Sequence, residues 1–280
     1  MIGMFLRQNP VSDKVFPLDK WNDGGYTCRE VAFRSGNNTL RGYCALSSSP
    51  RALVLIAHGL LGKSDGYEPV VEFLLERGYA VFIFDGTASG RSDGSRIVGL
   101  QQSRLDTRAA VDYIAADDGL SNLPLVIFGH SAGAYAAATE AERSSAAAVV
   151  CVSAFDRPID TMHYMARGYV SVLADIELPF LLMHEYAALG SSANSSASEA
   201  LIADDIPALI AHGELDARVP LEISLYDSLV GTNDKNITLF LDETESHSGH
   251  GNILFTEDGT LNAALLEAID SFLSPIVPVR

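Results

Sequence analysis

The sequence predicts an α/β domain built on a parallel β-sheet whose two faces are covered by helices. Short, wholly apolar runs recur along the chain, and amphipathic stretches separate them. Strands buried on both faces of a parallel sheet have this composition, and strands that alternate with helices indicate parallel crossover connections. The length of 280 residues, 48% of them hydrophobic, suits one large domain. We therefore expect a single domain spanning residues 1–280.

The first predicted element is a β-hairpin, because residues 27–35 and 38–46 alternate in polarity around a Gly-Asn-Asn turn. The buried-type strands that follow are residues 52–57, 80–84, 125–128, 147–152, 208–211 and 237–241. The helix candidates are residues 67–77, 102–116, 132–142, 221–229 and 261–273. Residues 155–205 separate two strands by far more than a crossover needs. Their apolar and aromatic composition predicts a helical insertion over the end of the sheet.

Composition narrows the classes of function. The formal net charge of −17 at pH 7 argues against binding to nucleic acid or to an anionic membrane, since both require a basic surface. Cys28, Cys44 and Cys151 are too scattered for a disulfide framework or a zinc site. No dinucleotide-binding glycine motif follows a first strand, so we expect no metal and no cofactor. With no visible secretory signal or membrane span, the expected location is cytoplasmic.

One short motif carries the strongest chemical signal. Ser131 lies in the sequence Gly-His-Ser-Ala-Gly, between the strand at 125–128 and the helix at 132–142. This context is typical of a nucleophile elbow, in which a sharp, strained turn exposes the serine hydroxyl and flanking glycines prevent collisions. A glycine-rich packing turn is the alternative interpretation. An acid, a base and oxyanion donors elsewhere in the sequence would favour the nucleophile elbow over the packing turn.

Those partners are sought where other strands end, because functional residues of open parallel sheets gather at the carboxyl ends of the strands. The backbone N–H groups of Leu60, just after His58 and Gly59, and of Ala132 are expected to form an oxyanion hole. Asp216, after the strand at 208–211, is the expected carboxylate that orients the base. The alternatives for this carboxylate are Glu214, Asp204 and Asp205.

A histidine must activate the serine, because a hydroxyl group is a weak nucleophile at neutral pH. His247 and His250 both lie on the Gly- and Ser-rich loop after the last strand, and either completes the chain order Ser, Asp, His. We favour His250 because Gly249 and Gly251 flank it and allow the backbone to bend. His247 is the second choice.

The chain resembles the α/β-hydrolase fold serine hydrolases over residues 25–275. The segments HGLLGKSDGY, FDGTASGRSDG and FGHSAG are similar to segments of feruloyl/cinnamoyl esterases and of monoacylglycerol-lipase-like carboxylesterases, and HGELDARVP resembles their acid loop. The resemblance implies a mostly parallel, eight-stranded sheet with a lid inserted after the sixth strand, where residues 155–205 fall. The segment GNILF after His250 is similar to the pattern that carries the base in related hydrolases.

The predicted function is hydrolysis of a carboxylic ester through an acyl-enzyme, with Ser131, His250 and Asp216 as catalytic triad. The apolar insertion favours a small-molecule ester with an apolar acyl or aryl group. One alternative is amide or peptide hydrolysis by the same residues. A second alternative is a ligand-binding homologue that keeps the fold without turnover.

Overall fold

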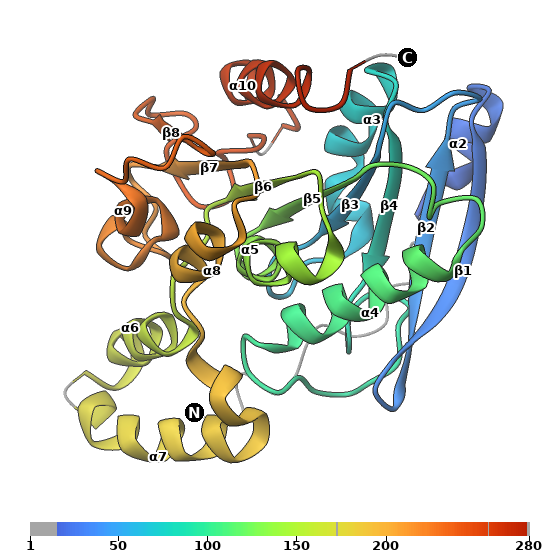
Figure 1. Ribbon diagram of the computed structural model, residues 1–280. Coiled ribbons are helices and arrows are strands. Elements are labelled where there is room, and N and C mark those ends of the chain that lie inside the picture. The colour runs from blue at the N-terminus through green and yellow to red at the C-terminus, as the bar shows by residue number, and fades with distance from the viewer. Residues whose placement is uncertain (1–15, 172, 257, 279–280) are drawn as a thin grey trace.

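The computed structural model describes residues 16–171, 173–256 and 258–278. They contain an eight-stranded sheet in the order β1-β2-β4-β3-β5-β6-β7-β8 (Figure 1). β2 is antiparallel to β1 and to β4, and the remaining neighbours are parallel. The strands are β1 (Thr27–Ser35), β2 (Asn38–Leu46), β3 (Leu53–Ala57), β4 (Ala80–Asp85), β5 (Leu125–His130), β6 (Ala148–Val152), β7 (Ala208–Gly213) and β8 (Ile237–Asp242). The predicted mostly parallel, eight-stranded sheet is confirmed.

Helices cover both faces of this sheet. Along β3, every residue is buried, and alternate side chains enter two separate hydrophobic clusters. One cluster is shared with α2 (Leu18–Asp23), α3 (Glu68–Glu76) and α10 (Ala263–Leu273). The other is shared with α4 (Gln102–Ala116), α5 (Ala132–Ser144), α8 (Ala197–Asp204) and α9 (Leu225–Leu229). Burial of each large aliphatic side chain stabilises the fold by about 1.5–3 kcal/mol, so an unbroken apolar strand favours this sandwiched position.

Several observed elements begin or end one or two residues from their predicted bounds, and two differences lie in or after β7. The helix expected at 221–229 divides into the 3₁₀ turn η3 (Leu221–Ile223) and α9, because Ser224 adopts an extended conformation and its side chain caps α9. β7 continues two residues beyond the predicted strand, to Gly213. The backbones of His212 and Gly213 pair with β8. Their side chains, one polar and one absent, do not indicate a strand, so the sequence did not predict this extension.

The interval 155–205 contains two kinds of structure. α6 (Pro158–Val170) and α7 (Leu173–Leu189) pack against each other and continue into the 3₁₀ turn η2 (Gly190–Asn194). Figure 1 shows α6 and α7 standing apart from the sheet, whereas α8 returns to pack on α5. α8 is thus a crossover helix of the core, and residues 158–194 are the part that extends away from it. Among the described residues, no helix is long and apolar enough to cross a membrane.

The segment 158–194 contacts the carboxyl edge of the sheet at two places. The hydroxyl of Tyr164 on α6 donates to the carbonyl of Ala217, 3.2 Å away, in the loop after β7. At the other side, the amide of Gln101 donates to the carbonyls of Ser192 and Ala193 at 2.8 and 3.0 Å. These contacts position α6 and α7 beside the edge where the parallel strands end.

Candidate active site

Ser131 occupies a strained turn between β5 and α5. Its φ and ψ angles are 56° and −119°, a combination that side-chain-bearing residues rarely adopt and that persists where the surroundings enforce it. A Cβ atom at Gly129 would lie 2.2 Å from the carbonyl oxygen of Gly133. A Cβ at Gly133 would lie 2.0 Å from the carbonyl oxygen of Ala57 at the end of β3. Both flanking glycines are therefore required by close packing of backbone on backbone.

Three predicted site residues meet at the ends of three strands. Ser131 Oγ lies 2.9 Å from His250 Nε2. On the other side of the imidazole, His250 Nδ1 lies 2.7 Å from Asp216 Oδ2. Because the carboxylate of Asp216 accepts a hydrogen bond from Nδ1–H, the tautomer of His250 presents an unprotonated Nε2 to the serine hydroxyl. Such an arrangement can remove the hydroxyl proton and hold it.

Asp216 is held as a charged group beneath the imidazole. Its Oδ1 accepts backbone N–H bonds from Arg218 and Val219, both at 2.9 Å, while Oδ2 bonds His250. Burial acts to raise the pKa of this carboxyl, but the hydrogen bond and charge of His250 and the Val219 N–H outweigh it, so the pKa lies below its usual range. An ionised carboxylate at this position can stabilise the imidazolium that forms when the base takes the proton of the serine hydroxyl.

The other candidate acids lie elsewhere. Glu214 is exposed, and its backbone N–H bonds the carbonyl of Asp242. Asp204 accepts the backbone N–H of Glu142, and Asp205 bonds the side chain of Asn236. Among the described contacts of the site, Asp216 is the carboxylate that reaches His250.

The two candidate histidines are separated clearly by their contacts. His247 Nδ1 lies 2.7 Å from the carbonyl of Asn252, within its own loop, whereas His250 reaches Ser131. The glycines beside His250 differ from expectation. Gly251 is not in a positive-φ conformation and has open space around it, while Gly249 donates its N–H to the Asn252 side chain. The close approach occurs instead at Gly213, where a Cβ would lie 2.2 Å from the carbonyl oxygen of Ser248.

The two predicted oxyanion donors lie on either side of Ser131. The N–H of Ala132 is the first of α5 and has no acceptor within the helix. A Cβ at Gly59 would lie 3.2 Å from Ser131 Cβ, so the loop carrying Leu60 runs against the serine. The Leu60 N–H makes no hydrogen bond to another residue in the described part of the chain. Both N–H groups remain available to a bound oxyanion.

His58 orders this loop. Its Nδ1 lies 2.8 Å from the carbonyl of Gly59, which requires a proton on that nitrogen. Nε2 then accepts the backbone N–H of Gly86 at 2.9 Å. His58 thereby connects the loops after β3 and β4 and leaves no ring nitrogen to act on Ser131.

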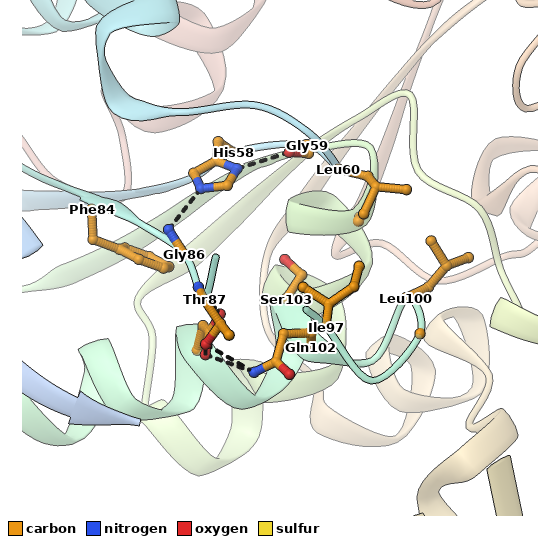
Figure 2. Close-up of a pocket in the computed structure, with 13 residues that line it drawn as sticks. His58, Gly59, Leu60, Phe84, Gly86, Thr87, Ile97, Leu100, Gln102 and Ser103 are labelled. Atoms are coloured by element: carbon orange, nitrogen blue, oxygen red, sulfur yellow. Dashed lines mark hydrogen bonds between the residues drawn. The ribbon is translucent and has the colours of Figure 1, made fainter. Parts of the chain in front are cut away.

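A cavity adjoins the oxyanion donors. Its volume is small, about 20 Å³, and Leu60 and Ala132 contribute to its wall. Figure 2 shows Leu60, Ile97 and Leu100 grouped around it, with hydrogen-bonded Gln102 nearby. The sequence did not predict that Ile97 and Leu100, from the loop between β4 and α4, line the site. The signal is faint, because these apolar residues are isolated in a small and polar segment.

Comparison with known proteins identifies the family. Residues 48–204, more than half of the chain, match the family described as serine aminopeptidase, S33. The chain belongs to this family. The match includes the nucleophile-elbow sequence and the loop that carries Leu60, and it ends before Asp216 and His250. Together with the fold, it identifies the protein as a serine hydrolase of the α/β-hydrolase type.

The chain is also similar to known proteins at low sequence identity. The chain is 28% identical to the uncharacterized protein YfhR of Escherichia coli O157:H7, over 76% of this chain and 69% of YfhR. It is 30% identical to human monoglyceride lipase over 36% of this chain and 34% of the lipase.

Two solved structures share the fold. The Pyrococcus furiosus esterase Pf2001 superposes with a TM-score of 0.73 at 18% identity, covering 97% of this chain and 98% of the esterase. Est1E of Butyrivibrio proteoclasticus, solved with bound ferulic acid, superposes with a TM-score of 0.66 at 19% identity, covering 88% of this chain and 99% of Est1E. These likenesses confirm the α/β-hydrolase fold.

Proposed function

We propose that the protein hydrolyses carboxylic esters through an acyl-enzyme formed on Ser131. The observation that carries this proposal is the continuous contact from Ser131 Oγ to His250 Nε2 at 2.9 Å and from His250 Nδ1 to Asp216 at 2.7 Å. A serine in a strained elbow, with a base on one side and free N–H groups on the other, has the parts that acyl transfer needs.

The reaction proceeds in two matched halves. Ser131 Oγ attacks the ester carbonyl while His250 Nε2 takes its proton, and the oxyanion accepts N–H bonds from Leu60 and Ala132. His250 then gives the proton to the leaving alcohol, and the acyl group remains on Ser131. In the second half, His250 takes a proton from water, hydroxide attacks the acyl carbon, and the acid leaves as Ser131 regains the proton.

The apolar side chains in the wall of the cavity support an apolar acyl or aryl group as the part of the ester that is recognised. Its wall next to the oxyanion donors contains Leu60, Phe84, Ile97 and Leu100. An acyl carbon bound to Ser131 would hold its substituent beside these side chains, and burial of apolar surface would contribute to binding. The names of related proteins agree with ester substrates, since Pf2001 is called an esterase and the human relative a monoglyceride lipase.

Hydrolysis of an amide or peptide bond is the second candidate. It is favoured by the description of the matched family as a serine aminopeptidase. The same residues would carry it, with His250 protonating a leaving amine in place of an alcohol. An ester and an anilide with the same acyl group separate the two candidates, because they differ in the leaving group alone.

In this proposal, the segment 158–194 is a lid over the active site. Tyr164 contacts the loop of Asp216, and Ser192 and Ala193 contact Gln101 beside the cavity. A lid at this position would cover the acyl group and limit the access of water to the acyl-enzyme.

The test is Ser131→Ala, assayed on p-nitrophenyl esters of increasing acyl length, on a feruloyl ester and on the matched anilides. We expect kcat to fall by several orders of magnitude, up to about 10⁶-fold. Ser145→Ala is the matched control, because Ser145 ends the same helix and also has a positive φ. It should retain activity. Full activity in Ser131→Ala would exclude Ser131 as the nucleophile. A wild type that neither hydrolyses these substrates nor labels at Ser131 with a fluorophosphonate would favour the non-catalytic alternative.

A further inference from the structure

A chain of hydrogen bonds runs behind Ser131 from the oxyanion loop to the base. The backbone N–H of Gly59 donates to the hydroxyl of Tyr67 at 3.0 Å. The same hydroxyl lies 2.8 Å from Nδ1 of His130. Nε2 of His130 lies 2.9 Å from the backbone carbonyl of His250. Two residues without a role in the proposed reaction, Tyr67 and His130, therefore connect the residue before Leu60 to the histidine that activates Ser131.

The protons of this chain have one consistent arrangement. A carbonyl oxygen can only accept, so His130 must carry its proton on Nε2, opposite the carbonyl of His250. Nδ1 then accepts a hydrogen bond from the Tyr67 hydroxyl, whose oxygen in turn accepts a hydrogen bond from the Gly59 N–H. Burial, with a contribution from the charge of His250, lowers the pKa of His130 to about 4. The imidazole thus stays neutral near pH 7, and the direction of the chain is preserved.

The hydrogen-bond chain ends at the loop of the proposed oxyanion donor and at the backbone of the base, and catalysis requires these two parts of the site to be aligned with each other. Gly59 precedes Leu60, whose N–H is the proposed oxyanion donor, and Figure 2 shows both residues at the cavity. The carbonyl of His250 is also bonded by Ser153 Oγ at 3.2 Å, so two donors hold the backbone of the base. His130 directly precedes Ser131 in the elbow. The hydrogen bonds of the Tyr67 and His130 side chains therefore connect the oxyanion loop, the nucleophile and the backbone of the base.

We propose that Tyr67 and His130 are positioning residues that hold the Leu60 N–H and the His250 imidazole in one alignment around Ser131. This inference rests on the proposed function. Neither side chain touches the reacting atoms, and their effect is on the geometry of the oxyanion donor and the base. Both act most strongly when charge develops on the substrate, so the loss should appear in kcat more than in KM.

Two variants interrupt the same link from opposite sides. Tyr67→Phe removes the hydroxyl and keeps the ring, which packs in the core beside Val71 and Phe128. His130→Gln keeps an amide N–H that can donate to the His250 carbonyl and replaces the ring, whose Nδ1 accepts from Tyr67, with a side chain that cannot place an acceptor and a donor at the same two positions. We expect each variant to lower kcat by about 10- to 100-fold, less than outright loss of an oxyanion donor, with KM changed by less than about threefold. The double variant should be no slower than the slower single variant, because both remove one link.

The control is Tyr79→Phe. Tyr79 is also a buried tyrosine, and its hydroxyl has no hydrogen-bond partner among the described residues. It should keep the wild-type kcat. Rates are expressed per active site titrated with a fluorophosphonate, so that loss of folded protein does not register as loss of kcat.

The outcomes separate this inference from the proposed function. If Ser131→Ala is inactive but Tyr67→Phe retains the wild-type kcat per titrated site, the positioning role is overturned and the triad stands. Losses that multiply in the double variant would also overturn it, since Tyr67 and His130 would then act independently. If Ser131→Ala retains activity, the proposed function itself fails.

Discussion

Gly213 lies at the end of β7, and replacing it by alanine tests how tightly the base loop is held. The added Cβ would lie 2.2 Å from the carbonyl oxygen and 2.4 Å from the carbonyl carbon of Ser248. That carbonyl also accepts the N–H of Leu215 at 2.8 Å, so it cannot turn away without losing a bond. His250 lies two residues after Ser248 in the same loop, so a shift of Ser248 would displace the base.

The size of the effect follows from the geometry. An ordinary contact of about 3.4 Å requires Ser248 and Gly213 to separate by about 1.2 Å. β7 is a fully buried strand paired on both sides, with β6 and β8, so the loop moves in preference to the strand. A displacement of about 1 Å in a catalytic group can cost about 10²-fold in rate, and we expect Gly213→Ala to lower kcat by roughly that factor.

The assay measures kcat and KM on one p-nitrophenyl ester, normalised by fluorophosphonate titration. Gly251→Ala is the matched control, because Gly251 adjoins His250 but has open space around it and an ordinary φ. It should remain within about twofold of the wild type. The reasoning is refuted if Gly213→Ala keeps its full kcat, or if Gly251→Ala loses as much.

Two further predictions concern histidines. His250→Ala should fall close to the level of Ser131→Ala, because nucleophile and base act as a unit, whereas His247→Ala should keep substantial ester hydrolysis; the reverse order would assign the base to His247. The second concerns stability: the pKa of His130 is about 4 in the fold against an ordinary 6.5, so the unfolded chain binds a proton first as pH falls. The free energy of unfolding should therefore decrease by about 3 kcal/mol between pH 6.5 and 4 through this group. Urea unfolding across that pH range should show a smaller decrease in the free energy of unfolding for His130→Gln than for the wild type. An equal decrease in the two proteins would contradict the assigned pKa of His130.

Local patterns in the sequence predict the elements well where adjacent residues carry the information. The hairpin strands match at Thr27–Ser35 and Asn38–Leu46, and the helix Gln102–Ala116 matches residue for residue. Apolar runs and amphipathic periods are properties of neighbouring residues, so they can be recognised without knowledge of the fold. The elbow at Ser131 is recognised from a short local motif, although one of its glycines, Gly133, packs on Ala57 at the end of another strand.

Contacts between distant segments could not be read in this way. His247 and His250 have the same chemistry and lie on the same loop. The sequence favours His250 because glycines flank it, yet one of them, Gly251, has open space around it in the structure. The constraint that shapes this loop comes from Gly213, on another strand, and local sequence carries no sign of it. The division of residues 221–229 at Ser224 likewise depends on capping and on a bridge to Phe155.

By itself, then, the sequence determined the type and order of the elements, the turn that exposes Ser131 and a short set of candidate partners. The tertiary structure decided which candidates meet. It brings His250 to Ser131 across 119 positions and to Asp216 across 34, and it joins Tyr67 to His130 across 63. The physical reason is that strand order and close packing of backbone on backbone set these distances, and both arise from the whole chain packing on one sheet.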